Sequence, residues 1–243
     1  MLCHDVILKA IDQSSLKKYV TIKGGLVVQK LSNNVRRVTK DIDFDFIHYS
    51  LSDSAIEKFI DSLNCIDDFS ITYVGCFTEL NQQDYKGKRI HLNISDSYNN
   101  SIGTKIDIGV HNNLDIYQEE LLIDICIQED TIQLLVNSRE QIIVEKLKSL
   151  LRFMSNNTRY KDVFDICFLL GDCDAGILKK YLKIIIYSDN TMPVSDDEEL
   201  LNHLEKLFEN AKYMSKLNAS NKNWLDISPD EAVSEILEYF KKL

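Results

Sequence analysis

The residues best suited to chemistry are two aspartates, Asp41 and Asp43. They are separated by one residue, in a segment where acidic and apolar residues alternate. On a strand, alternate side chains share a face, so both carboxylates would point one way while Ile42 and Phe44 enter a core. Hard divalent cations bind carboxylate oxygens, and two ions about 4 Å apart can stabilise the attacking and leaving oxygens of phosphoryl transfer. The pair predicts a metal site; the alternative is two acids on an exposed strand.

A third carboxylate is needed for two metal ions, and Asp107 is the candidate. Apolar residues alternate through residues 104–110, which leaves Asp107 and Lys105 on the other face of a strand. We expect Asp41, Asp43 and Asp107 to bind magnesium or manganese. The alternative for Asp107 is a solvated strand acid. Asp45 continues the face of Asp41 and Asp43, and we interpret it as solvated or as a neighbour of the metal ligands.

A glycine pair, Gly24 and Gly25, follows an apolar segment and precedes a short apolar helix. Glycine lacks a Cβ, so the backbone can approach a phosphate closely, and the N-terminus of the following helix is positive. The turn is therefore a candidate triphosphate site. The alternative is an ordinary connection between a strand and a helix, but its position just before the aspartate pair favours the binding site.

A lysine and two aspartates occur where helical periodicity expects apolar residues. In residues 139–154, Lys146 lies within the apolar arc, where an amine is costly unless it is paired or bound to an anion. In residues 160–170, Asp162 is in line with apolar positions, and Asp165 flanks it. We expect Lys146 to contact nucleotide phosphates while Asp162 orients it. The alternatives are a lysine that reaches the rim and acids that favour a helix first turn.

Composition sets limits on the partners. The 243 residues have a formal net charge of -10, which argues against binding long nucleic acid over the whole surface. Local basic stretches at 36–40, 86–89 and 146–161 leave room for a basic pocket. Six cysteines lack a Cys-x-x-Cys pair, so we expect reduced, buried thiols. Without a signal segment or a long apolar span, we expect a cytoplasmic protein with no membrane partner.

The hydrophobic period divides the chain into residues 1–137 and 138–243. The first part predicts an α/β domain with a mixed or antiparallel sheet, and the second a helical bundle that contributes Lys146 and Asp162 to a cleft. Strands are expected at 19–23, 42–49, 69–77, 88–94, 104–110, 121–128 and 131–136. Helices are expected at 26–31, 53–63, 139–154, 160–170, 176–187, 196–216 and 229–242.

These residues resemble the AbiEii/AbiGii-type nucleotidyltransferase toxins. The likeness rests on Lys23-Gly24-Gly25, on the run 37–44 that begins with Arg37 and contains both aspartates, on residues 145–152 around Lys146, and on residues 159–166. The last of these contains Arg159, Asp162 and Asp165. The motifs extend to about residue 170, and the helices after Asp174 match none of them.

The resemblance implies an α+β, DNA polymerase β-like nucleotidyltransferase fold, magnesium-dependent transfer of a nucleotide from a nucleoside triphosphate, and a toxin opposed by an antitoxin. It implies that the matching aspartates bind metal and that the matching lysine and helical aspartate are essential. Arg37, Arg159, Asp165 and Lys23 are further candidates around the nucleotide.

We therefore expect a nucleotidyltransferase whose acceptor is an RNA end, such as that of a tRNA, or a protein hydroxyl. The alternative is a catalytically weak or inactive protein that retains the fold and binds nucleotide or a partner. That alternative rests on Leu26, which stands where the family often has a hydroxyl after its glycine pair.

Overall fold

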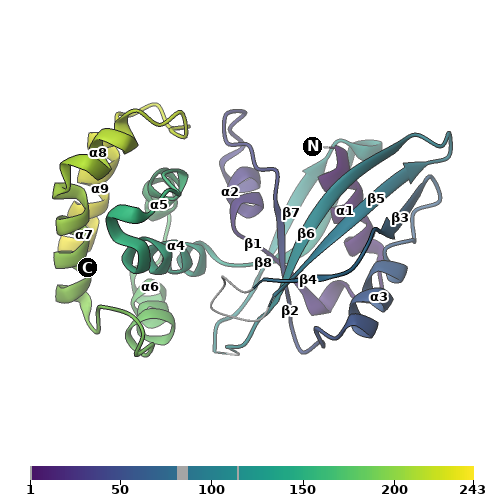
Figure 1. Cartoon of the computed structure of the whole chain (residues 1–243), viewed down its shortest axis with the longest axis horizontal. Coiled ribbons are helices and arrows are strands. Elements are labelled where there is room, and N and C mark those ends of the chain that lie inside the picture. The colour runs from purple at the N-terminus through teal and green to yellow at the C-terminus, as the bar shows by residue number, and fades with distance from the viewer. Residues whose placement is uncertain (1, 81–86, 114) are drawn as a thin grey trace. The chain divides into compact units, whose positions relative to one another are not determined.

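The computed structural model describes residues 2–80, 87–113 and 115–243, so Lys86 of the basic stretch lies outside the described residues. The chain forms two compact units, Met1–Asn137 and Ser138–Leu243. Figure 1 shows a sheet with helices in the first unit and helices in the second. The predicted α+β class is confirmed. The units meet in sequence where the hydrophobic period changes from that of strands to that of helices.

The first unit is built on one mixed sheet of eight strands. They are β1 (Val20–Lys23), β2 (Ile42–Phe46), β3 (Phe69–Tyr73), β4 (Thr78–Glu79), β5 (Lys88–Asp96), β6 (Ser101–Val110), β7 (Glu119–Ile125) and β8 (Asp130–Val136). The strand order is β3-β5-β6-β2-β1-β8-β7, and β4 pairs with β5. The pairs β2–β6 and β1–β8 are parallel and the others antiparallel. The predicted strands all occur, although several are shorter, and the two-residue β4 was not predicted.

The central strands separate an apolar face from a polar face. Ile42, Phe44 and Phe46 alternate along β2 and are almost completely buried, and the same is true of Ile106 and Ile108 on β6. The residues between them carry the charged side chains. Because β2 and β6 are parallel and in register, the charged residues of both strands project from the same face.

The α-helices among the described residues of this unit are α1 (Leu2–Gln13), α2 (Gly25–Ser32) and α3 (Asp53–Ser62). In Figure 1, α1 and α3 lie on the same side of the sheet. Phe59 of α3 packs against Phe46 with ring centroids 5.1 Å apart, and the Cys65 thiol after α3 donates to the Ala10 carbonyl oxygen of α1. The two helices therefore cover the apolar face. No helix was predicted before residue 19, so α1 was missed.

The second unit contains α4 (Arg139–Phe153), α5 (Lys161–Leu170), α6 (Ala175–Leu182), α7 (Asp197–Glu209), α8 (Ala211–Asn218) and α9 (Pro229–Lys242), and a π-helical turn, Lys183–Tyr187, continues α6. The prediction of one helix over 196–216 is wrong. Asn210 has ψ of 104°, which ends α7, and its side chain accepts the Tyr213 N–H to begin α8. Ser228 and Glu231 form a reciprocal cap at the start of α9.

The cysteine prediction is partly wrong. All six thiols are free, but Cys65, Cys76 and Cys126 are exposed, and only Cys167 is buried. An apolar neighbourhood in sequence did not predict burial because these three residues lie in the connections between helices and strands. No helix among the described residues is long and apolar enough to cross a membrane.

The two leucines of α1 provide a matched test of its role in the core. Leu8 is 0% exposed and Leu2 is 57% exposed. Leu8→Ala should lower the free energy of unfolding by about 2–5 kcal/mol because it leaves a cavity, whereas Leu2→Ala should change it by less than about 0.5 kcal/mol. Urea denaturation followed by circular dichroism measures both, and equal effects would show that α1 does not pack as described.

Candidate functional site

The three candidate metal ligands lie on the polar face of the sheet. Asp43 on β2 and Asp107 on β6 are Cα partners in the parallel ladder, so their side chains project side by side. Asp107 is buried, at 8% exposure. Asp41 immediately precedes β2, and its side chain is 54% exposed. The sequence predicted that Asp107 would lie on a strand neighbouring the aspartate pair, and this is the arrangement found.

Two basic side chains contact these carboxylates. Arg89 of β5 binds Asp107 with two hydrogen bonds, Nε to Oδ1 at 2.8 Å and Nη2 to Oδ2 at 2.7 Å. Lys105 of β6 places its ammonium 2.9 Å from Asp41 Oδ1. The hydrogen bond to Asp107 raises the pKa of Arg89, although burial acts in the opposite direction, and the charges of Asp41 and Asp43 raise this pKa further. The acidic face is thus partly neutralised by the protein itself.

The acidic face fits a divalent cation in its chemistry, although the carboxylates are not arranged around one point. Within the described part of the chain, no group of three or more His, Cys, Asp or Glu side chains is positioned to hold a metal ion. Arg89 and Lys105 each contact one of the three carboxylates. Asp43 and Asp107 still supply hard oxygen donors from adjacent strands, which is the donor type that magnesium and manganese bind.

The glycine turn lies directly beside the acidic face. Gly24 has φ of 65° and ψ of -136°, a conformation open essentially to glycine, and a Cβ there would lie 3.3 Å from Asp43 Oδ2. A Cβ on Gly25 would lie 3.1 Å from Thr39 Oγ1 and 3.2 Å from an Arg37 guanidinium nitrogen. The turn therefore brings the N-terminus of α2 to a metal-ligand candidate, and Gly25 to a hydroxyl and a guanidinium.

Lys23, the residue before this turn, has a structural partner. Its ammonium lies 2.7 Å from Asp45 Oδ1, and both side chains are at least nine-tenths buried. Burial raises the pKa of Asp45, and the Lys23 charge opposes that shift. The interpretation of Asp45 as solvated is wrong, because its side chain is buried and is paired with the Lys23 ammonium. The structure places the Lys23 ammonium on this carboxylate.

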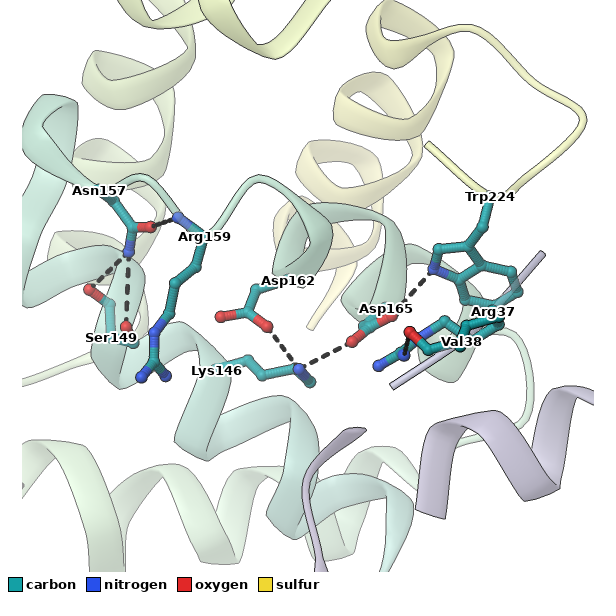
Figure 2. A network of polar contacts seen from close by, with 9 residues as sticks. All are labelled: Arg37, Val38, Lys146, Ser149, Asn157, Arg159, Asp162, Asp165 and Trp224. Atoms are coloured by element: carbon teal, nitrogen blue, oxygen red, sulfur yellow. Dashed lines mark hydrogen bonds and ion pairs between the residues drawn. The ribbon is translucent and has the colours of Figure 1, made fainter. Parts of the chain in front are cut away.

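In the second unit, Lys146 of α4 lies between two carboxylates of α5 (Figure 2). Its ammonium is 2.5 Å from Asp162 Oδ1 and 2.8 Å from Asp165 Oδ2, and its side chain is only 11% exposed. Burial lowers the pKa of Lys146, but the two carboxylates outweigh it, so the pKa lies above its ordinary value. The ammonium is therefore charged and fixed in place. Asp162 holds it as predicted, and Asp165 contacts it just as directly.

Asp165 is itself fixed by Trp224, the one tryptophan of the chain. The indole Nε1 donates to Asp165 Oδ1 at 2.9 Å, so each Asp165 oxygen has a different partner (Figure 2). Both Asp165 and Trp224 are buried. Sequence reasoning missed Trp224 because it follows an Asn/Ser-rich loop with no motif. A tryptophan in such a polar segment was the available signal, since a buried indole N–H requires an acceptor.

The remaining candidates are two arginines. Arg159 is exposed, and its backbone N–H donates to Asn157 Oδ1 at 2.7 Å, while the Asn157 amide donates to the Ser149 carbonyl oxygen at 3.1 Å (Figure 2). Arg37 is buried and donates from Nη1 to the Val38 carbonyl oxygen at 3.3 Å. Arg159 belongs to the second unit with Lys146, and Arg37 to the first with the glycine turn.

A strand-turn-helix-strand segment with in-register acids and a glycine turn is the arrangement expected of a metal-dependent nucleotidyltransferase. A family model described as "Nucleotidyl transferase AbiEii toxin, Type IV TA system" matches residues 6–238. The chain therefore belongs to this family of toxin nucleotidyltransferases and is an enzyme of that class. The resemblance inferred from the sequence motifs is confirmed.

Solved structures are also similar to this chain. The crystal structure of an antigenic nucleotidyltransferase-like protein from Paracoccidioides brasiliensis is similar to this chain, with a TM-score of 0.46 and 16% sequence identity. The match covers 89% of this chain and 92% of that chain. No curated protein matches the sequence.

The glycine turn can be tested with two glycines of the same unit. Gly24→Ala should lower the free energy of unfolding by about 1–3 kcal/mol because of its backbone conformation, and it should weaken nucleotide binding because the methyl group crowds Asp43. Gly103→Ala on β6 is the control, since a Cβ there meets nothing within 4 Å. Thermal unfolding and calorimetric titration with each nucleoside triphosphate measure both effects. Equal behaviour of the two variants would contradict the close approach.

The buried Lys146 cluster predicts both a stability loss and its pH dependence. Asp165→Asn removes one of the two carboxylates that pair with Lys146 and should lower the free energy of unfolding by about 3–5 kcal/mol. Trp224→Phe removes the indole donor and part of the ring and should lower it by about 1–3 kcal/mol. Because the folded pKa of Lys146 is raised above 10.5, its contribution is fully present below that pH and is lost above it. The difference between wild type and Asp165→Asn should therefore stay constant from about pH 6 to 9. Chemical denaturation across this range measures it, and a difference that vanishes near pH 8 would argue against a charged Lys146.

Proposed function

We propose that this enzyme transfers a nucleotide from a nucleoside triphosphate to a macromolecular acceptor in a reaction that requires magnesium or manganese. The observation that carries the proposal is the register of Asp43 with Asp107 on adjacent parallel strands, beside a glycine turn at the start of α2. Nucleotidyltransferases generally use divalent metals, and the family to which the chain belongs fits this reaction.

Asp43 and Asp107 are the proposed principal metal ligands, and Asp41 is the third. A bound divalent ion would polarise the phosphoryl oxygens and stabilise the charge that develops on them. The chain's own contribution is to hold the carboxylates on a rigid sheet and to present the amides of Gly24 and Gly25 close to Asp43. The Leu26 side chain packs in the core at 1% exposure, so the proposed phosphate contacts at this turn are the backbone amides and not a side-chain hydroxyl at position 26.

Lys146 is the proposed phosphate-binding cation of the second unit. An ammonium has three N–H donors, and the described contacts of Lys146 engage Asp162 and Asp165, which leaves one donor for a phosphate oxygen. Because Trp224 fixes Asp165 and the carboxylates fix the ammonium, the lysine is held in one geometry before substrate binds. Arg159 and Arg37 are the proposed additional contacts with the triphosphate.

The proposed acceptor is an RNA 3′ end, such as that of a tRNA, or a protein hydroxyl. The formal net charge of -10 disfavours contact with long nucleic acid over the whole surface but not entry of one RNA end into a basic site. The family description places the protein in a toxin-antitoxin system. We therefore propose that an antitoxin opposes this transferase activity in the cell.

Transfer of label from each α-labelled nucleoside triphosphate to total RNA and soluble protein tests the function. Wild type should label an acceptor with magnesium or manganese and not with a chelator present. Asp43→Asn, Asp107→Asn and Lys146→Met should each reduce the rate by at least about 100-fold, because each removes charge stabilisation from the transferred phosphoryl group.

The matched control is Asp68→Asn, which changes an exposed aspartate outside the site and should retain the wild-type rate. Ribonuclease and protease digestion of the labelled product identify the acceptor. The proposal fails if wild type labels nothing with any of the four triphosphates, or if Asp43→Asn and Asp107→Asn label as fast as Asp68→Asn does.

A further inference from the structure

Arg89 occupies a position on the acidic face that none of the roles above explains. It is the Cα partner of Asp107 in the antiparallel pair of β5 and β6, so both side chains project from the face that carries Asp43. Its guanidinium engages both oxygens of Asp107 in a planar, two-point contact. The Arg89 side chain is 36% exposed and that of Asp107 is 11% exposed, so the arginine is the partner with room to move.

The charge of Arg89 acts on the whole acidic cluster. Asp41 and Asp43, as well as Asp107, raise the pKa of this guanidinium, which means that all three carboxylates lie close enough to stabilise its charge. Lys105 contacts Asp41 on the same face. Three negative charges are thus accompanied by two positive ones, and without these cations the carboxylates would repel one another across adjacent strands.

Metal binding at Asp107 and the two-point contact with Arg89 compete with each other. Arg89 engages both oxygens of the carboxylate, and a divalent ion on the same group would stand next to the charge of the guanidinium. Movement of the arginine away from Asp107 therefore favours metal binding. Triphosphate oxygens offer a planar guanidinium the same two-point contact that a carboxylate does, so the side chain can exchange one anion for another.

We propose that Arg89 is a triphosphate-binding residue that pairs with Asp107 until metal and nucleotide arrive, and that this exchange couples the two binding events. The inference rests on the proposed function, since it uses the same metal ligands. In the free enzyme Arg89 lowers the affinity of the acidic face for a metal ion. In the complex it binds the triphosphate, so metal and triphosphate each strengthen the binding of the other.

The experiment compares full-length wild type with Arg89→Gln and Lys88→Gln. Lys88 is the matched control, because it is the adjacent cation on β5 but pairs with Ile108 and so lies on the opposite face, where its ammonium contacts Asp53 and Glu79. The first measurement is Mn²⁺ binding without nucleotide, read from the electron paramagnetic resonance signal of free Mn²⁺. Arg89→Gln should bind Mn²⁺ about threefold to tenfold more tightly than wild type, because the partly exposed pair no longer competes. Lys88→Gln should bind as wild type does.

The second measurement is calorimetric titration with Mn²⁺-loaded inorganic tripolyphosphate, which avoids any dependence on the base. Arg89→Gln should bind this probe at least about tenfold more weakly than wild type, since a charge-assisted two-point contact is lost. Arg89→Lys provides the same comparison if Arg89→Gln does not fold: a lysine cannot engage both Asp107 oxygens, so Mn²⁺ affinity should again rise and tripolyphosphate affinity fall.

The outcomes separate this inference from the proposed function. If wild type binds no Mn²⁺, or binds it equally well after Asp43→Asn, the metal site itself is wrong and both proposals fail. If Mn²⁺ binding depends on Asp43 but Arg89→Gln changes neither Mn²⁺ nor tripolyphosphate affinity, only the role of Arg89 is overturned. A fall in both affinities also overturns it, because Arg89 would then support the site structurally.

Discussion

The parallel pairing of β2 with β6 is the constraint on which the first unit depends. When parallel strands pair in register, the side chains of paired residues project from the same face of the sheet. Ile42 and Phe44 therefore enter the core together with the residues that pair with them on β6, while Asp43 stands beside Asp107. A shift by one residue would bury the carboxylates and expose the apolar residues. The energy that fixes the core therefore also fixes the acids, and no separate interaction is needed to align them.

The sequence predicted the strands of this arrangement better than the order in which they pair. Alternation around Asp43 and Asp107 predicted strands with acids on one face, and the glycine pair predicted a close backbone approach to a phosphate. In the structure the glycine turn lies close to the acids, since a Cβ added at Gly24 would lie 3.3 Å from Asp43 Oδ2. Strand order could not be predicted, because periodicity reports the faces of a strand and not its neighbours. Helix α1 was missed although its polar residues Asp5, Lys9 and Asp12 recur at helical spacing.

Residues that act through a partner were the hardest to predict. Lys146 was predicted as a site residue because an amine in the apolar arc of a helix requires an anion. Asp162 was predicted because it also stands at an apolar position of a helix. Trp224 had no such signature: its role depends on a loop of the second unit reaching Asp165, a contact between residues 59 positions apart. Lys23 was predicted as a nucleotide contact from its position beside the glycines, and in the structure its ammonium contacts Asp45.

In both clusters, carboxylates are paired with cations of the protein itself. In the second unit Lys146 is buried with two acids, one of them tied to an indole, so the contacts form a fixed unit. On the sheet, Arg89 contacts Asp107 from a more exposed position. Burial separates these cases: a buried pair resists exchange because separation leaves charges without water, whereas a partly exposed guanidinium can change partners at small cost. The exposure of the side chain thus distinguishes Lys146, a cation held in one position, from Arg89, a cation that can change partners.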